Sequence, residues 1–457
     1  MENQQRVKVP VQTELFAKRK SEMTSAERAS LLRNKLYQTA KQDKGFKFYV
    51  LYDKLFIPYM LHEAWKQVRS NDGSPGIDGT TIDDIEAYGV NTYLTELGEE
   101  LRTRTYRPMA VKRVMIAKDG GGERPLGIPV IKDRIAQTVC KLVLEPIFEA
   151  DFEDSSYGFR PKRSSKDAMA AIKGHLQSGK TSVLDADLSK YFDTIPHDKL
   201  MIAVKERISD PRVLDLITMW LKVPVYEDGQ FKGGKKNKLG TPQGGVISPL
   251  LANVYLHLLD RIVNKPQSLF ARLGVKIVRY ADDFVLLGSN ITDDVMERLK
   301  WLLNRMGLTL NEKKTKRTDA RKDSFNFLGF TVRYSIDLFN KLKRYWEIMP
   351  SAKSETKIRE KIRVHLEKHG HSSAKDIANG LNAIIRGWLN YFDLKGVSYA
   401  AMSKRRLRHY LITKLNRYYN RKSQRKSRLY RHRAFEVLVS HHGLIDPTKF
   451  ESPTRPL

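Results

Sequence analysis

The stretch that most constrains the fold is residues 277–287, in which two adjacent acids, Asp282 and Asp283, lie between two short apolar runs. Apolar runs of this length around a tight turn predict a β-hairpin with the acids at its tip. Burying an ionised carboxylate without a counter-charge is costly, so this arrangement favours a bound divalent cation. An Asp-Asp turn in a solvated hairpin would give the same local pattern, and this stretch alone leaves both interpretations open.

A second pair of acids, Asp185 and Asp187, lies on a predicted strand nearer the N-terminus. Alternate residues of a strand share a face, so both acids point one way while Leu184, Ala186 and Leu188 point to the buried side. One of these acids could complete a metal site with the hairpin pair, or both could be solvated on an edge strand. Three carboxylates with few histidines or cysteines favour magnesium or manganese over zinc.

The net charge of +30 is the most unusual feature of the composition. It favours a polyanionic partner, with nucleic acid as the first expectation and an anionic membrane surface as the second. No apolar run approaches the roughly 20 residues of a membrane span, and the N-terminus lacks the apolar core of a signal peptide, so we expect a cytoplasmic protein. Cys140 is the only cysteine, which excludes an internal disulfide and a paired-cysteine zinc site and predicts packing in the core.

Two glycine-containing segments are candidate ligand loops. Residues 111–135 predict a strand, a glycine turn at 120–122, the segment 123–129 and a basic helix start at Lys132 and Arg134. Flexible glycines beside fixed cations suit a loop that folds over phosphates, although a solvated hairpin fits as well. Gly244 and Gly245 precede an apolar helix and leave the backbone unshielded, so that a base pair could lie on it; close packing is the alternative.

The C-terminal region predicts a small, basic helical domain. Apolar residues from 381 to 392 keep helical spacing and define one buried face. Residues 394–435 then carry fourteen Lys or Arg and no acid, with tyrosines between them. This pattern suits an RNA backbone and unstacked bases, and a solvated charged face is the alternative. The tyrosines are Tyr410, Tyr418, Tyr419 and Tyr430, and the candidate RNA-binding residues are Arg405, Arg406, Arg408, Lys414, Arg417 and Arg421.

From about residue 51 to residue 430 the chain resembles the group II intron-encoded reverse transcriptase and maturase family. The motifs that carry the resemblance, in the family's order, are Ser74-Pro-Gly-Ile-Asp-Gly, Arg124-Pro-Leu-Gly-Ile-Pro, Tyr157-Gly-Phe-Arg-Pro, Asp187 with Phe192, Thr241-Pro-Gln-Gly-Gly, Tyr280-Ala-Asp-Asp, Leu310-Asn-Glu-Lys-Lys-Thr and Phe327-Leu-Gly-Phe. The resemblance implies an α+β right-hand polymerase with fingers, palm and thumb. The implied domains are 1–50, a basic N-terminal extension; 51–340, fingers and palm; 341–435, a basic α-helical thumb/maturase domain; and 436–457, a tail.

The resemblance also implies the roles of individual residues. Asp187, Asp282 and Asp283 would be catalytic and, with Leu188, would hold two Mg²⁺ ions, for which Mn²⁺ could substitute; Asp185 would be a neighbour only. Nucleotide binding is implied for Lys132, Arg134, Arg160, Phe192, Gln243 and Lys314. Among these, Phe192 would clash with a ribose 2′-hydroxyl and favour deoxynucleotides. Primer and template contacts are implied for Gly244, Gly245, Leu328 and Gly329.

The implied function is an RNA-directed DNA polymerase that uses an RNA template, a DNA primer and deoxynucleoside triphosphates. It would also bind group II intron RNA in a nucleoid-associated ribonucleoprotein and assist splicing and retromobility. A free-standing reverse transcriptase for host defence or repair and a polymerase-inactive splicing maturase remain alternatives. No paired cysteines or His-Asn-His pattern follow residue 435, so we expect no endonuclease domain, and we expect His441 and His442 to be exposed.

Overall fold

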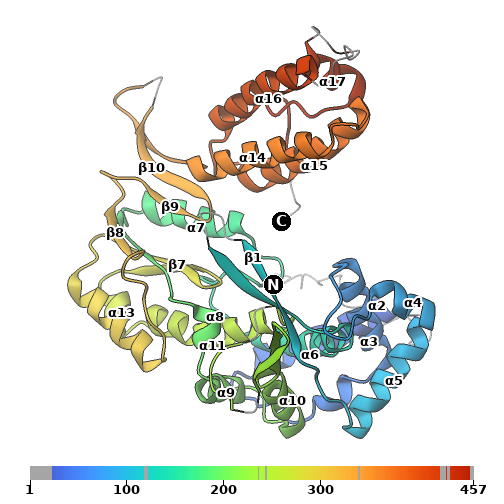
Figure 1. The fold of residues 1–457 in the computed structure, drawn as a ribbon. Helices are drawn as coiled ribbons and strands as arrows, with labels where there is room; N and C mark the ends of the chain where they lie inside the picture. The colour runs from blue at the N-terminus through green and yellow to red at the C-terminus, as the bar shows by residue number, and fades with distance from the viewer. Residues whose placement is uncertain are drawn as a thin grey trace, which may run out of the picture. The chain divides into compact units, whose positions relative to one another are not determined.

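The computed structural model describes residues 23–117, 122–234, 236–241, 244–337, 340–421, 429 and 433–452 (Figure 1). The chain divides into two compact units, each built from three separate stretches of sequence. Unit 1 consists of residues 1–154, 188–261 and 301–309, and unit 2 consists of residues 155–187, 262–300 and 310–457.

Unit 1 is largely helical. Its helices are α2 (Ser25–Gln42), η1 (Tyr52–Lys54), α3 (Pro58–Ser70), α4 (Ile82–Tyr88), α5 (Val90–Thr103), α6 (Ile131–Glu149), α8 (Tyr191–Thr194), α9 (His197–Lys205), α10 (Pro211–Leu221) and most of α11 (Ser248–Asn264). Helix α2 begins with a capping box, in which Glu27 N–H donates to the Thr24 hydroxyl and Thr24 N–H donates to the Glu27 carboxylate. Helix α6 packs against α2 and α3, and Cys140 is fully buried on it, as predicted.

Unit 1 also holds a four-stranded sheet in the order β2-β1-β4-β5. The strands are β1 (Val111–Ala117), β2 (Glu123–Ile128), β4 (Pro224–Glu227) and β5 (Gln230–Gly233). Residues 223–238 predict a hairpin with its tip in the lysine-rich segment 232–238, but the structure places the turn earlier, between β4 and β5. The turn is Asp228-Gly229, both with positive φ, which is the usual signature of a two-residue hairpin turn. Lys232 lies on β5 and pairs with Glu227 at 2.7 Å.

Unit 2 contains two antiparallel sheets and a set of helices. One sheet has the order β6-β7-β3-β8, from β3 (Ser182–Ala186), β6 (Lys276–Tyr280), β7 (Asp283–Gly288) and β8 (Lys316–Asp319). The other has the order β11-β10-β9, from β9 (Phe325–Phe327), β10 (Phe330–Ile336) and β11 (Arg344–Pro350). The helices are α7 (Ser165–Gln177), α12 (Leu269–Arg272), most of α13 (Asp293–Arg305), α14 (Ala352–Lys368), α15 (Ala374–Phe392), α16 (Ala401–Arg421) and α17 (Ala434–His442). One hydrophobic cluster connects α7, both sheets and the C-terminal helices.

Helices α14 to α17 form the predicted C-terminal helical region (Figure 1). The predicted apolar face of α15 is confirmed, with Leu381, Ile385 and Leu389 fully buried. The expectation that the tyrosines stack on bases does not hold for Tyr419, which is 3% exposed because it continues the buried face of α16. Tyr410 is half-buried and donates to a backbone carbonyl, while Tyr430 lies outside the described residues.

His441 is exposed at the end of α17, as expected, and His442 is half-buried. No helix within the described ranges is both long enough and apolar enough to cross a lipid bilayer.

Candidate active site

The predicted hairpin with two acids at its tip is confirmed by strands β6 and β7. Tyr280 pairs with Asp283 across the hairpin, so Ala281 and Asp282 form a two-residue turn. Ala281 has φ of +59°, in the left-handed region that a Cβ atom disfavours. Arg279 is fully buried and its Nη1 donates to the Ala281 carbonyl at 2.8 Å. This buried arginine, which we did not single out from the sequence, therefore holds the turn that carries Asp282.

A second brace on the turn comes from the Tyr157-Gly158 segment. Tyr157 N–H donates to the Arg279 carbonyl at 2.9 Å, and Arg279 N–H donates to the Ser155 carbonyl at 2.9 Å. A Cβ on Gly158 would lie 2.8 Å from the Tyr280 carbonyl carbon and closer still to Ala281 N, so only glycine fits. The prediction for this motif rests on Arg160 alone, and its glycine is the signal that it overlooks.

Asp187 directly follows strand β3, which pairs with β7. Ala186 lies opposite Phe284, so the same register continued by one residue brings Asp187 opposite Asp283. Asn311 Nδ2 donates to the Asp187 carboxylate at 3.0 Å, and Lys314 Nζ lies 3.2 Å from the same oxygen. The motif that contributed Lys314 as a candidate nucleotide-binding residue thus also orients a candidate catalytic acid.

The carboxylates of this cluster oppose one another's ionisation. Burial raises the pKa of Asp283 to about 6, with further contributions from the negative charges of Asp282, Asp187 and Asp185, and Lys314 opposes this rise. Burial, followed by the charge of Asp187, raises the pKa of Asp185 to about 6. The four carboxylates therefore disfavour one another's ionised form, and a bound cation would relieve this repulsion.

The donor chemistry of the cluster fits a hard divalent cation. In the part of the chain that the structure describes, no three His, Cys, Asp or Glu side chains converge closely enough to enclose a metal ion as they stand. The carboxylates nevertheless lie within electrostatic reach of one another, and Asp187 is 31% exposed and so open to a ligand. Carboxylate oxygens are the donors that Mg²⁺ and Mn²⁺ prefer.

Two further predicted residues of unit 2 have backbone contacts. Arg160 is 7% exposed and its Nη1 donates to the Ser156 carbonyl at 2.7 Å, within the segment that braces the hairpin. Leu328 and Gly329 form the turn between β9 and β10. Its carbonyls accept hydrogen bonds from the Tyr391 hydroxyl at 3.1 Å and from the Ser354 hydroxyl at 2.9 Å, which tie it to α15 and α14.

In unit 1 the backbone links Phe192 to the Thr241-Pro-Gln-Gly-Gly motif. Thr241 N–H donates to the Phe192 carbonyl at 2.7 Å, and the Phe192 ring is 9% exposed. Gln243 lies outside the described residues. Gly244 packs on strand β2, where a Cβ would lie 3.0 Å from the Gly127 carbonyl carbon and closer still to its oxygen. This contact agrees with the close-packing alternative for Gly244.

Lys132 and Arg134 both have protein partners at the start of α6. Lys132 pairs with Glu100 at 2.7 Å, and Arg134 donates to the carbonyls of Gly73, at 3.0 Å, and of Ser74. These contacts hold the start of the Ser74-Pro-Gly-Ile-Asp-Gly motif. The role of Lys132 and Arg134 in nucleotide binding stays a prediction.

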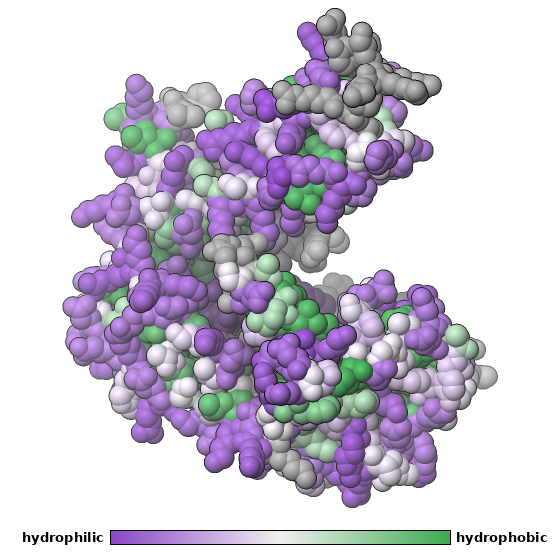
Figure 2. Space-filling view, in the orientation of Figure 1, coloured by the Kyte–Doolittle hydropathy of each residue, from purple (hydrophilic) through white to green (hydrophobic). Residues whose placement is uncertain are grey.

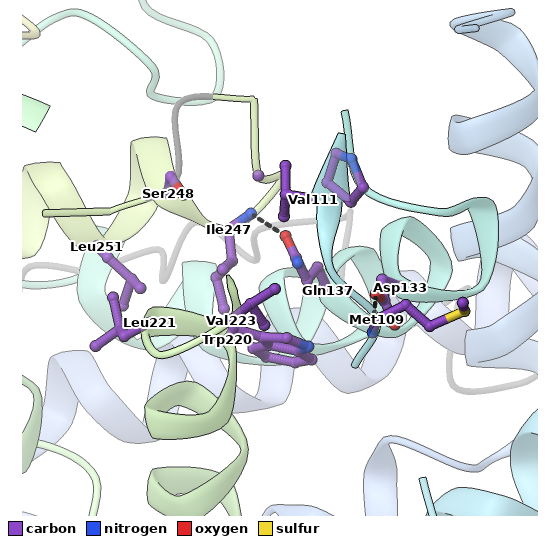
Figure 3. Close-up of a pocket in the computed structure, with 12 residues that line it drawn as sticks. Met109, Val111, Asp133, Gln137, Trp220, Leu221, Val223, Ile247, Ser248 and Leu251 are labelled. Carbon is purple, nitrogen blue, oxygen red and sulfur yellow. Dashed lines mark hydrogen bonds between the residues drawn. The ribbon is translucent and has the colours of Figure 1, made fainter. Parts of the chain in front are cut away.

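Asp133, between these two cations, is a buried acid that sequence reasoning missed. It is 2% exposed and accepts hydrogen bonds from the Tyr106 hydroxyl at 2.6 Å and from Met109 N–H at 2.9 Å. Burial raises its pKa to about 6. Asp133 also lines a cavity of about 10 Å³, the room that one water molecule needs (Figure 3). Across this cavity the Gln137 side chain accepts a hydrogen bond from Ile247 N–H at 3.4 Å, which links α6 to the segment after Gly245 (Figure 3).

The candidate RNA-binding residues all lie on α16. Arg405, Arg406 and Arg417 are exposed, Arg408 and Lys414 are half-buried, and the side chain of Arg421 lies outside the described residues. Arg406 lies 3.3 Å from Glu355, and Arg408 lies 3.0 Å from Asp446. Hydrophilic side chains cover most of the visible surface of α14 to α16 (Figure 2).

Comparison with known proteins agrees with the motifs. Residues 116–332 match the family described as reverse transcriptase (RNA-dependent DNA polymerase), and residues 355–435 match the group II intron maturase-specific domain. The chain therefore belongs to the group II intron-encoded reverse transcriptase and maturase family.

Three relatives illustrate the extent of the similarity. Protein YkfC of Escherichia coli K12 is 34% identical over 70% of this chain and 90% of its own length. The group II intron-encoded protein LtrA of Lactococcus lactis subsp. cremoris is 30% identical over 62% of this chain, and an uncharacterised 91 kDa protein in the cob intron of Schizosaccharomyces pombe is 26% identical over 81% of it. The chain spans only about half the length of these last two relatives, at 56% and 54%.

Proposed function

We propose that this chain is an RNA-directed DNA polymerase of right-hand architecture, with fingers and palm within 51–340 and the thumb/maturase domain within 341–435. The observation that carries the proposal is the cluster of mutually repelling carboxylates on β3 and the β6–β7 hairpin. A protein that only binds nucleic acid has no need to concentrate negative charge in this way, and phosphoryl transfer does.

Asp187, Leu188, Asp282 and Asp283 would hold two Mg²⁺ ions. When bound, these ions would activate the primer 3′-hydroxyl and neutralise the triphosphate. Lys314, which pairs with Asp187 at 3.2 Å, would contact the pyrophosphate side of the nucleotide. Phe192 would exclude a ribose 2′-hydroxyl, and Leu328-Gly329 would position the primer.

The match to the maturase-specific domain supports a second activity in the same chain. The basic surface of α16 would bind group II intron RNA in a nucleoid-associated ribonucleoprotein, where it would assist splicing and retromobility. This activity would use a different surface from polymerisation, so the two should be separable by mutation.

Primer extension on an RNA template tests the polymerase assignment. With Mg²⁺, the wild type should extend a DNA primer with deoxynucleotides and not with ribonucleotides. The double variant Asp282→Ala/Asp283→Ala should lose extension while RNA affinity, measured by filter binding, stays nearly unchanged.

Asp293→Ala/Asp294→Ala is a matched control, because it removes another adjacent Asp pair, at the start of α13, where Asp293 is 87% exposed. This control should keep full extension. Extension that persists in the Asp282/Asp283 variant, or a folded wild type that binds RNA and never extends a primer, would refute the assignment.

A further inference from the structure

Helix α16 and the segment 446–449 form a pocket of about 340 Å³ that is open to solvent. The pocket is lined by Arg405, Arg408, His409, Ile412, Asp446, Thr448 and Lys449. The α16 residues follow i, i+3, i+4, i+7 spacing, so they share one stripe of the helix. The other wall of the pocket is the segment 446–449. This segment lies beyond residue 435, where the match to the maturase-specific domain ends.

The pocket has an excess of positive charge. Arg405, Arg408 and Lys449 contribute three fixed cations, and Asp446 is the one acid that lines it. Arg405 and Lys449 are both exposed, and neither forms an ion pair with an acid among the residues that the structure describes. Within the described ranges these two cations therefore have no ion-pair partner and can meet an anion in the pocket.

Asp446, the acid in the pocket lining, already has hydrogen-bond partners within the protein. Asp446 is 8% exposed and accepts hydrogen bonds from Arg408 Nε at 3.0 Å, from Thr448 N–H at 2.9 Å and from the Thr448 hydroxyl at 2.7 Å. Although burial opposes ionisation, the hydrogen bonds from Thr448 and the partner Arg408 together hold the pKa of Asp446 below its usual value. Asp446 thus fixes the 446–449 turn and Arg408, and leaves the pocket cationic.

We propose that this pocket binds a backbone phosphate of RNA, with Arg405 and Lys449 as the direct contacts and Arg408 held in place behind them by Asp446. Arginine and lysine donors from two walls suit a phosphodiester, which carries one negative charge and several acceptor oxygens. This inference rests on the proposed binding of RNA and extends its site to a C-terminal segment outside the maturase-specific match. RNA would thus contact α16 and the 446–449 segment together.

The test compares Arg405→Ala/Lys449→Ala with the wild type in binding a fluorescent RNA hairpin and, separately, a DNA duplex of the same length, across a range of salt concentrations. We expect at least about a tenfold loss of RNA affinity at low salt, and a log–log salt slope that is shallower by about one unit, as the loss of one phosphate contact predicts. Both side chains are exposed, so the thermal midpoint should not change. The single variant Arg405→Lys keeps the positive charge, so its RNA affinity should lie much closer to that of the wild type than to that of the double variant.

Lys375→Ala/Arg386→Ala is the matched control. It removes two exposed cations from α15 of the same unit, so the net charge changes equally. An equal loss of affinity in this control, no loss in the pocket variant, or a loss confined to the DNA duplex would each overturn the proposal. If the wild type itself bound no RNA, both the proposed RNA binding and the pocket proposal would be overturned, whereas a loss of only the pocket effect would leave RNA binding standing.

Discussion

Ala281 shows how a single residue position is imposed by its neighbours. Its left-handed conformation costs an alanine about 1 kcal/mol, so the turn adopts it only because other contacts hold it there. One of these contacts comes from the buried guanidinium of Arg279 and another from the backbone at Gly158. The direction in which Asp282 leaves the turn therefore depends on residues that carry no chemistry themselves.

Gly158→Ala should lower DNA synthesis by more than about tenfold. The added methyl group would collide with the Ala281 and Tyr280 backbone, and relief of overpacking of this kind costs about 1–3 kcal/mol and shifts the turn. Primer extension and the thermal midpoint measure the two effects. Gly174→Ala on α7, where a Cβ meets open space, is the control and should be neutral or slightly stabilising. Full activity of Gly158→Ala would show that the turn does not need this contact.

Asp133 gives a prediction about pH. Its folded-state pKa of about 6 lies above the ordinary value of 3.8, so between these values the folded chain binds more protons at this site than the unfolded chain. The stability that comes from protonated Asp133 is therefore present at about pH 4 and is lost as the pH rises through 6. Relative to Asp133→Asn, the wild type should lose on the order of 2 kcal/mol of stability across this interval.

Thermal midpoints of both proteins at about pH 4 and about pH 8 measure this difference. Asp215→Asn on α10 is the control, because this carboxylate is exposed in the same unit. The difference between its thermal midpoint and that of the wild type should be the same at both pH values. A gap between Asp133→Asn and the wild type that does not change with pH would contradict the raised pKa.

At the scale of elements, the β9–β10 turn depends on other elements as the β6–β7 turn does. Leu328 and Gly329 both have positive φ, at +49° and +78°. A Cβ on Gly329 would meet the Ser354 hydroxyl at 3.0 Å and the Phe392 ring at 3.4 Å. The turn is thus shaped by its own sequence and also by its packing on α14 and α15.

Gly329→Ala should therefore destabilise the chain by more than the cost of the left-handed conformation alone. Gly396 has almost the same φ, +77°, with open space around it, so Gly396→Ala measures the conformational cost alone, about 1 kcal/mol. We expect Gly329→Ala to lower the thermal midpoint further and to shorten primer-extension products. Equal effects of the two substitutions would mean that the packing against α14 and α15 is easily relaxed.

The sequence predicted local elements well and missed the contacts that hold these elements together. The hairpin at Asp282 rests on neighbouring residues, so a local pattern indicates it. Gly158 and Asn311 act on residues that are far away in the sequence, and the Arg279 side chain holds a backbone carbonyl two residues away. No periodicity reports such contacts. Charge patterning also misled at Tyr419, because an amphipathic helix can bury an aromatic on its apolar side while its other side is basic.

At the scale of the whole chain, the candidate acids come together through non-local pairing. Asp187 and Asp283 are close because β3 and β7 are neighbours in one sheet, although unit 1 residues 188–261 intervene in the sequence. The division into two discontinuous units could not be predicted from composition, since no linker-like stretch marks the crossings. The acids themselves allowed a shared site, and only the motif order favoured it over solvated acids on an edge strand.

The net charge of +30 leads to the last prediction, which concerns RNA binding by the full chain. Each phosphate that a protein neutralises contributes about −0.7 to −0.9 to the slope of log affinity against log salt, because condensed counterions are released. A surface with cations on α16 and on the 446–449 segment should contact several phosphates, so we expect a slope steeper than about −4 between about 50 and 200 mM salt. Asp282→Ala/Asp283→Ala should keep this slope, because its substitutions lie away from α16 in the sequence and add no cation. A slope near −1 would mean that most of the positive charge does not face RNA, and the +30 would then need another explanation.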